Sequence, residues 1–301
     1  MDIIPNVSTQ KLSRLCNRLT TPQLLVKHKD DTNSLWLYMR PTPIPCFTIE
    51  LLRDLNRAFD EVANYNHSHG KGIQYIVVAS AIDGVFNLGG QLSLFLECIQ
   101  EQDKPRLMQY ARECVNACLA SSKSYQNGAI TIALVEGIAY GGGFEAALSC
   151  NLLIAEKTAK FAFPESLFQL FPGMGALNYL NRSVGLKIAN KMIKDTKLYS
   201  PDELANLGVV DLVAGKGEGF EAVSQYLRKH QKQHATDLAV LNAVNRIDPI
   251  SDSAMMQIAD IWVDLAFQVP KQALKVMSRL NRTQSRHGWS PQSDALSGLV
   301  G

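Results

Sequence analysis

The sequence lacks the long apolar runs and the basic clusters that would direct it to a membrane or to a nucleic acid. It contains no run of about 18 apolar residues. Residues 1–5 have neither a basic start nor an apolar core, so no secretory signal is expected. The 30 basic and 28 acidic residues leave a net charge of +2, and no Lys/Arg cluster contains interleaved aromatic residues. We therefore expect a cytoplasmic protein with no membrane span and no nucleic-acid partner.

Cysteine pairs with metal-ligand or redox spacing are also missing. The six cysteines include no C-x-x-C pair, and without a secretion signal we expect them to be buried free thiols. Cys114 and Cys118 would share one face of a helix, because residues at i and i+4 do so. The six histidines lie mostly in polar stretches, and none is assigned to catalysis. Residues 215–219 are glycine-rich but lack the Walker spacing, so we interpret them as a turn.

Hydrophobic patterning divides the chain into four parts. Short apolar strands alternate with amphipathic helices from residue 21 to about 213, which predicts an α/β core with helices on both faces of a sheet. From residue 220 onward the patterns are helical, so residues 214–285 are expected to form a C-terminal helical region. Residues 1–20 fit an N-terminal arm as well as a short docking helix, and residues 286–301 have the composition of a disordered tail. The expected strands lie at 23–27, 34–39, 75–79 and 132–135, and the expected helices at 48–65, 92–100, 105–120, 176–184, 186–194, 200–208, 220–229, 235–244, 252–267 and 271–282.

The most informative stretch of the sequence runs from residue 132 to residue 175. Three consecutive glycines, at 141–143, open a helix that has Glu145 in its first turn among apolar neighbours. Glu165 follows a proline and again lies between apolar stretches. Taken singly, the glycines fit tight turns and Glu145 fits a residue that complements the helix dipole. Together they predict a site, because free N–H groups at a helix start bind anions and two carboxyls in apolar surroundings can divide the roles of acid and base.

These residues resemble the two-glutamate signature of the crotonase (enoyl-CoA hydratase/isomerase) superfamily, and residues 85–92 resemble its first oxyanion-hole loop. The resemblance runs from about residue 20 to about residue 285. It is closest to the bacterial diffusible signal factor synthases, through segments 86–90, 141–150, 170–175, 198–200 and 261–264. The resemblance implies a ClpP/crotonase-like α/β fold, a spiral of ββα units. It also implies that the helical region at 214–285 covers the site and supports a homotrimer or a dimer of trimers.

The resemblance also assigns the catalytic groups. The oxyanion-hole N–H groups would belong to Gly90 and Gly142, with Gly89 as the competitor for the first place. Glu145 and Glu165 would act jointly as acid and base, and the sequence leaves open which of them holds the proton at rest. No cofactor and no metal are implied.

Two further residues would line an apolar pocket for the acyl chain. They are Met174, in the segment that follows Glu165, and Trp262, in the helical region. Trp262 fits equally well as a core residue of an amphipathic helix, so both interpretations stay open at this point.

As a signal factor synthase, the protein would dehydrate a 3-hydroxyacyl chain on acyl carrier protein to a cis-2-enoyl chain. It would then hydrolyse the thioester and release a free fatty acid for quorum sensing. The alternative is an ordinary enoyl-CoA hydratase of fatty-acid metabolism. Gln91, where many CoA hydratases have aspartate, and the lack of a clear basic cluster for the CoA phosphate favour the carrier protein. A third alternative is a regulatory module with an idle site that binds the receiver domain of a sensor kinase.

Overall fold

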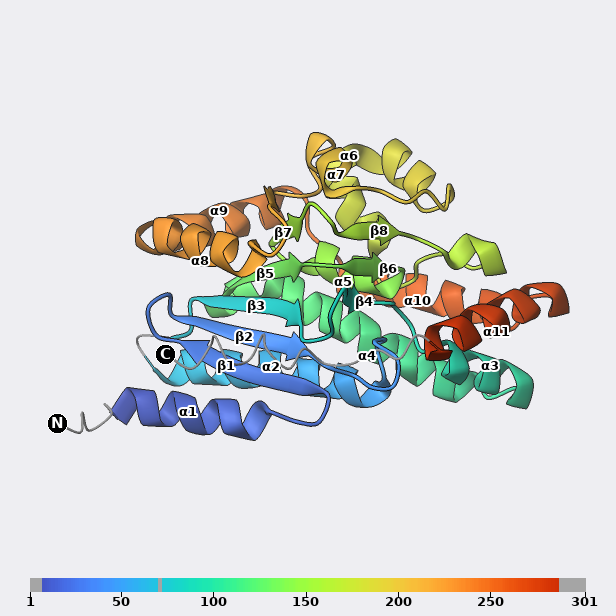
Figure 1. The fold of residues 1–301 in the computed structure, drawn as a ribbon, viewed down its shortest axis with the longest axis horizontal. Coiled ribbons are helices and arrows are strands. Elements are labelled where there is room, and N and C mark those ends of the chain that lie inside the picture. Colours follow the sequence, from blue (N-terminus) through green and yellow to red (C-terminus); the bar gives the residue numbers. More distant parts are fainter. Residues whose placement is uncertain (1–6, 70–71, 287–301) are drawn as a thin grey trace.

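The computed structural model describes residues 7–69 and 72–286, and its elements are drawn in Figure 1. The strands are β1 (Leu24–Lys29), β2 (Ser34–Met39), β3 (Tyr75–Ser80), β4 (Val85–Asn87), β5 (Ile130–Val135), β6 (Ile138–Tyr140), β7 (Leu152–Glu156), β8 (Lys160–Ala162) and β9 (Leu212–Ala214). The α-helices are α1 (Val7–Leu19), α2 (Ile49–Ser68), α3 (Leu92–Glu101), α4 (Lys104–Lys123), α5 (Gly142–Ser149), α6 (Ala176–Met192), α7 (Pro201–Asn206), α8 (Gly219–His230), α9 (His234–Ile247), α10 (Asp252–Ala266) and α11 (Lys271–Arg286). Short 3-10 helices are η1 (Ser124–Asn127), η2 (Glu165–Phe168) and η3 (Gln231–Gln233).

Two sheets form the framework of the described chain. The larger has six strands in the order β1-β2-β3-β5-β7-β9, and the smaller has three in the order β4-β6-β8. Among the paired strands of the described residues, only β1 and β2 are antiparallel to each other. The chain winds as a spiral, because β3, β5 and β7 of the large sheet are each followed by a strand of the small one (Figure 1). This is the expected crotonase fold of ββα units, and the prediction of the fold class is confirmed.

The large sheet is covered on both faces, and β2 shows why. All six of its side chains are buried, although neighbouring residues on a strand point to opposite faces. Leu35, Leu37 and Met39 join the main core, which includes residues of α1, α2 and α4. Trp36 and Tyr38 join a second cluster, with residues of α8. An uninterrupted apolar strand is the pattern expected of a strand buried on both sides.

Two strands of the small sheet lie in segments where the sequence pattern indicated no strand. Residues 80–90 contain β4, and residues 136–143 contain β6. Strands of three residues are too short to show a two-residue alternation in the sequence, and what defines them is their pairing with each other. This pairing brings the loop at Gly89 and Gly90 beside the glycines that open α5.

The two ends of the described chain show how residues 7–19 fold and where the last helix ends. Of the two alternatives for residues 1–20, the structure supports the docked helix, because residues 7–19 form α1 with Leu12, Leu15 and Leu19 buried against the main core. At the other end, α11 continues to Arg286, four residues beyond the expected end of the last helix. Residues 1–6 and the rest of the expected tail, 287–301, lie outside the described residues.

In other parts of the described chain, the structure agrees with local signals in the sequence. Ser200 accepts a hydrogen bond from the Glu203 N–H while the Glu203 side chain accepts one from the Ser200 N–H, which forms a capping box at the start of α7. The helices expected at 176–184 and 186–194 lie within α6, where Gly185, with non-helical backbone angles of φ 75° and ψ 155°, separates them at a kink. All six cysteines are free, and five of them are buried. Across residues 7–69 and 72–286, none of the helices is both long enough and apolar enough to cross a membrane.

Candidate active site

The three glycines at the start of α5 allow its first turn to lie directly against the β4 loop. Gly141 has φ 52° and ψ −124°, a conformation that only glycine adopts easily. A β-carbon on Gly143 would lie 2.1 Å from the carbonyl oxygen of Asn87, so the close approach excludes any side chain there. As a result, Glu145 enters the first turn of a helix whose N–H groups face the β4 loop.

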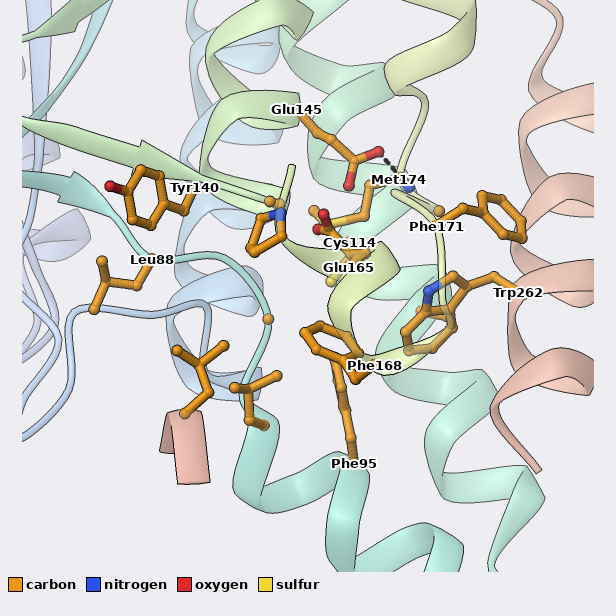
Figure 2. A pocket seen from close by; sticks show the side chains of 18 of the residues that line it. Leu88, Phe95, Cys114, Tyr140, Glu145, Glu165, Phe168, Phe171, Met174 and Trp262 are labelled. Atoms are coloured by element: carbon orange, nitrogen blue, oxygen red, sulfur yellow. Dashed lines mark hydrogen bonds between the residues drawn. The ribbon is translucent and has the colours of Figure 1, made fainter. Parts of the chain in front are cut away.

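Glu145 has a buried carboxyl that is held by backbone groups. The residue is 1% exposed, and its Oε1 accepts hydrogen bonds from the N–H group of Met174 at 2.7 Å, drawn as a dashed line in Figure 2, and from that of Ala176 at 3.0 Å. Burial raises the pKa of Glu145 to about 7, although these backbone hydrogen bonds oppose the rise by favouring the charged form. The carboxyl can therefore exchange a proton near neutral pH.

Glu165 lies in η2, directly after Pro164, and its carboxyl rests against Gly141. A β-carbon on Gly141 would lie 2.3 Å from Oε1 of Glu165. The other oxygen, Oε2, is buried and has no hydrogen-bonding partner among residues 7–69 and 72–286. Burial, and then the charge of Glu145, raise the pKa of Glu165 to about 8. Both glutamates line one cavity, and Figure 2 shows their carboxyl groups directed into the same space.

Gly90 and Gly142 lie next to each other at the same cavity. A β-carbon on Gly142 would lie 3.6 Å from the Gly90 nitrogen. Within the described residues, neither the Gly90 nor the Gly142 N–H donates a hydrogen bond to the chain. Gly89 differs, because its N–H donates to Asn87 Oδ1 at 2.8 Å. The geometry therefore leaves two adjacent N–H groups, those of Gly90 and Gly142, free to bind a ligand oxygen.

Tyr110 of α4 fixes the position of the loop that contains Gly90 through hydrogen bonds, and nothing in the sequence indicated this contact. Its hydroxyl donates to the Phe47 carbonyl at 2.6 Å and accepts from the Gln91 N–H at 3.1 Å. The Phe47 N–H in turn donates to the Gly89 carbonyl at 2.8 Å. One buried hydroxyl thus ties the loop to the segment before α2. The three segments are far apart in the sequence, so only the fold could show the contact.

We expect Tyr110→Phe to lower kcat for the reaction of this site about tenfold with little change in KM, because the loop that aims the Gly90 N–H loses its anchor. We also expect the free energy of unfolding to fall by about 1–3 kcal/mol, since a buried carbonyl and a buried N–H lose their partner. Steady-state kinetics and urea unfolding measure the two effects.

Tyr75→Phe is the matched control for the Tyr110 prediction. Tyr75 is also buried, but its hydroxyl has no hydrogen-bonding partner. Its removal should leave both kcat and stability nearly unchanged. Equal effects of the two substitutions would contradict the anchoring role of Tyr110.

The cavity has a volume of about 240 Å³ and mostly apolar walls. Met174 and Trp262 both line it. Trp262 is only 7% exposed and packs against Phe95 with ring centroids 5.1 Å apart, so it is a core residue that also reaches the cavity wall. That the cavity binds an acyl chain stays a prediction. Other lining residues that sequence reasoning missed are Leu88, Leu92, Phe95, Tyr110, Ala111, Cys114, Phe168, Phe171, Leu280 and Gln284.

A partial signal for this wall was present in the sequence. Tyr110 and Cys114 are four residues apart on the apolar face of α4, but the neighbouring sequence does not show whether this face contacts a ligand or the core.

Within the described residues, no group of three or more His, Cys, Asp or Glu side chains is arranged to hold a metal ion.

The chain is similar to enoyl-CoA hydratases in sequence and in fold. A family model described as enoyl-CoA hydratase/isomerase matches residues 37–258. The chain is 26% identical over 253 residues to the probable mitochondrial enoyl-CoA hydratase 2 of Arabidopsis thaliana, which covers 81% of this chain and 79% of that protein. It is 25% identical over 211 residues to the mitochondrial methylglutaconyl-CoA hydratase of Mus musculus, which covers 67% of this chain and 62% of that protein. A crystal structure of enoyl-CoA hydratase from Bacillus halodurans has the same fold, with a TM-score of 0.75 at 23% identity over 85% of this chain and 99% of that one.

Proposed function

Since the chain belongs to the enoyl-CoA hydratase/isomerase family, we propose that it adds water to, or removes water from, the Cα–Cβ bond of an acyl thioester. The observation that carries the proposal is a single arrangement. Two carboxyls with raised pKa values face one apolar cavity beside two unpaired glycine N–H groups. This arrangement supplies an acid, a base and two donors for a developing oxyanion.

In the proposed reaction, the thioester carbonyl oxygen accepts hydrogen bonds from the N–H groups of Gly90 and Gly142. These donors stabilise the enolate that forms when the Cα–Cβ bond gains or loses water. In the hydration direction, ionised Glu145 takes a proton from water as the oxygen attacks the β-carbon, and protonated Glu165 gives its proton to the α-carbon. Dehydration follows the same path in reverse, starting with the proton on Glu145.

The contacts of the two carboxyls support this division of roles. Two backbone N–H groups point at Glu145 and favour its ionised form, whereas Oε2 of Glu165 is enclosed without any donor. A charge is therefore more costly on Glu165, and the shared proton rests there. This resting state suits hydration directly. It also answers, as a proposal, the question that the sequence left open.

The pair should give a bell-shaped pH dependence of kcat/KM for hydration, with its maximum near pH 7–8, because burial raises the pKa of Glu145 to about 7 and that of Glu165 to about 8. At lower pH the pair holds two protons and lacks a base. At higher pH it holds none and lacks an acid. Initial rates from about pH 5 to about pH 10 measure the profile, and a rate that stays constant through the neutral range would contradict the shared-proton arrangement.

We further propose the signal factor synthase reaction for this site: dehydration of 3-hydroxyacyl-carrier-protein and then hydrolysis of the cis-2-enoyl thioester. A glutamate would activate the hydrolytic water, and the same N–H pair would hold the tetrahedral oxyanion. Support comes from the resemblance of segments such as 170–175 and 261–264, whose Met174 and Trp262 both line the apolar cavity. Such a cavity suits a fatty acyl chain.

An ordinary enoyl-CoA hydratase is the second candidate, and a specific observation favours it. The similar curated proteins are named as CoA hydratases, and the resting proton on Glu165 suits addition of water. The third candidate is a binding module for a receiver domain with an idle site, and it stays a prediction. The two carboxyls with raised pKa values that line the cavity argue against an inactive site. Assembly as a homotrimer or a dimer of trimers also stays a prediction.

The experiment that separates the candidates incubates the protein with 3-hydroxydodecanoyl-carrier-protein and, separately, with crotonyl-CoA, and identifies the products by mass spectrometry. A free cis-2-dodecenoic acid that is absent with Glu145→Gln/Glu165→Gln would support the synthase. Hydration of crotonyl-CoA with an untouched carrier substrate would replace the synthase by the ordinary hydratase. No reaction with either thioester would overturn the proposed chemistry.

A further inference from the structure

Helix α11 carries five basic residues and no acidic residue. Lys271, Lys275, Arg279 and Arg282 are exposed and recur at intervals of four, four and three residues. At about 100° per residue these four side chains fall within an arc of about 80°, on one face of the helix. We call this row the basic face. Within the described residues, none of the four forms an ion pair.

The opposite face of α11 is already occupied by the protein. Ala273 and Met277 are buried. The helix packs on α3, which lies beside it in Figure 1, and on η2, the turn that carries Glu165. Leu280 and Gln284 line the active-site cavity. The basic face is therefore turned to solvent on the same helix that forms part of the cavity wall.

Nearby carboxylates do not neutralise the basic face, because other cations hold them. On the neighbouring α3, Glu97 and Glu101 both pair with Arg106, at 3.1 Å and 3.9 Å. On α10, Asp264 pairs with Lys104 at 2.5 Å. Four cations on this helix are thus left without a counter-charge from the part of the chain that the structure describes, and such a row attracts an acidic partner.

The shape of the row selects the kind of partner. From Lys271 to Arg282 it extends about 16 Å along a convex helix, at 1.5 Å per residue. A nucleotide phosphate needs cations that converge on one point, which a straight convex row does not provide. A bilayer surface needs exposed apolar residues beside the cations, and the apolar face of α11 is packed inside. An extended acidic protein surface fits both the length and the charge.

We propose that the basic face of α11 docks an acidic acyl carrier protein, whose thioester arm then enters the cavity beside Leu280 and Gln284. The inference rests on the proposed function, since it names the carrier of the acyl thioester. Charge contacts of this kind govern the association of the carrier, while the chemistry depends on the carboxyls and glycines inside. Docking and catalysis are therefore separable by substitution.

The test uses Lys275→Glu/Arg279→Glu, which reverses the middle of the basic face. The matched control is Lys229→Glu/Lys232→Glu, two exposed lysines without ion pairs near the end of α8, at the other end of the long axis of the molecule (Figure 1). Kinetics are measured with the same 2-enoyl chain on carrier protein, on CoA and on pantetheine, which has no nucleotide. Thermal unfolding by circular dichroism checks that both variants fold.

We expect the α11 variant to raise KM for the carrier-protein substrate by about tenfold or more, with kcat and the pantetheine reaction nearly unchanged. The control should behave as the wild type, and added salt should weaken the wild type towards the variant. An unchanged KM for the carrier substrate would overturn the proposal. An equal rise of KM for CoA would assign the face to the nucleotide phosphates and also overturn it.

Direct binding separates this proposal from the proposed function. Fluorescence anisotropy of a labelled acyl-carrier-protein needs no turnover, so docking is supported if wild type binds and the α11 variant does not, even when neither converts the substrate. Hydration of the CoA thioester without any carrier binding would overturn docking and leave the family chemistry intact. Sedimentation with anionic phospholipid vesicles, lost in the α11 variant, would assign the face to a membrane and overturn the carrier proposal.

Discussion

Glu165→Gln is expected to lower kcat/KM for hydration by about 10²–10⁴-fold, because the amide cannot deliver a proton to the α-carbon. Glu145→Gln should lower it by a similar factor, since an amide cannot take a proton from the attacking water. The effects of the two substitutions should not add, because both carboxyls act on one proton transfer sequence. A single variant that keeps its rate within tenfold of wild type would contradict the acid–base pair.

Stability gives a second readout for Glu165. Its pKa is raised in the folded protein, so the folded form holds the proton more tightly than the unfolded chain. The stabilisation is complete below the usual glutamate pKa and is lost as the pH rises towards about 8. The melting temperature of Glu165→Gln should therefore decline less over this range than that of wild type.

Glu136→Gln is the control for the glutamate predictions. Burial, and then the charges of Glu156 and Asp83, raise the pKa of Glu136 to about 7, but the residue does not line the active-site cavity. Its substitution should also flatten the pH dependence of stability, while activity stays near that of wild type. If Glu136→Gln also lost activity, the assay would respond to the loss of any carboxyl with a raised pKa. The loss of activity in Glu165→Gln would then no longer support a catalytic role for Glu165.

Gly141→Ala is expected to lower kcat by about 10²-fold or more, because the new methyl group would displace the Glu165 carboxyl. The added β-carbon would lie 2.3 Å from Oε1 of Glu165 and 3.2 Å from its carboxyl carbon. A shift of about 1 Å in a catalytic group has an effect of this size. The unusual backbone angles of Gly141 should also reduce the free energy of unfolding by about 1–3 kcal/mol.

Gly185→Ala separates backbone strain from the displaced carboxyl. Gly185, in the kink of α6, has φ 75° and ψ 155°, and a β-carbon there would meet no atom within 4 Å. We expect a comparable loss of stability with no loss of activity. If Gly141→Ala lost stability to the same extent but kept its kcat, the contact between Gly141 and Glu165 would have no part in catalysis.

Strong local signals in the sequence predicted the positions of most of the helices and strands. Thr48 accepts a hydrogen bond from the Leu51 N–H at the start of α2, as an N-cap residue does, and Ser200 accepts one from the Glu203 N–H at α7. These signals are short-range, so a few neighbouring residues suffice to specify them. The strands β4 and β6 gave no such signal, because three residues become a strand only through a partner about 50 positions away.

The sequence by itself identified the candidate site residues: the glycines at 141–143, and Glu145 and Glu165 in apolar surroundings, belong to one continuous stretch that resembles the family motif. Only the tertiary structure determined how these residues are positioned relative to the rest of the site. It placed Gly90 beside Gly142, tied the Gly90 loop to Tyr110, and set Trp262 and α11 over the cavity. The reason is physical: a helix presents an apolar face whether it meets the core, a substrate or another helix, and only packing selects which.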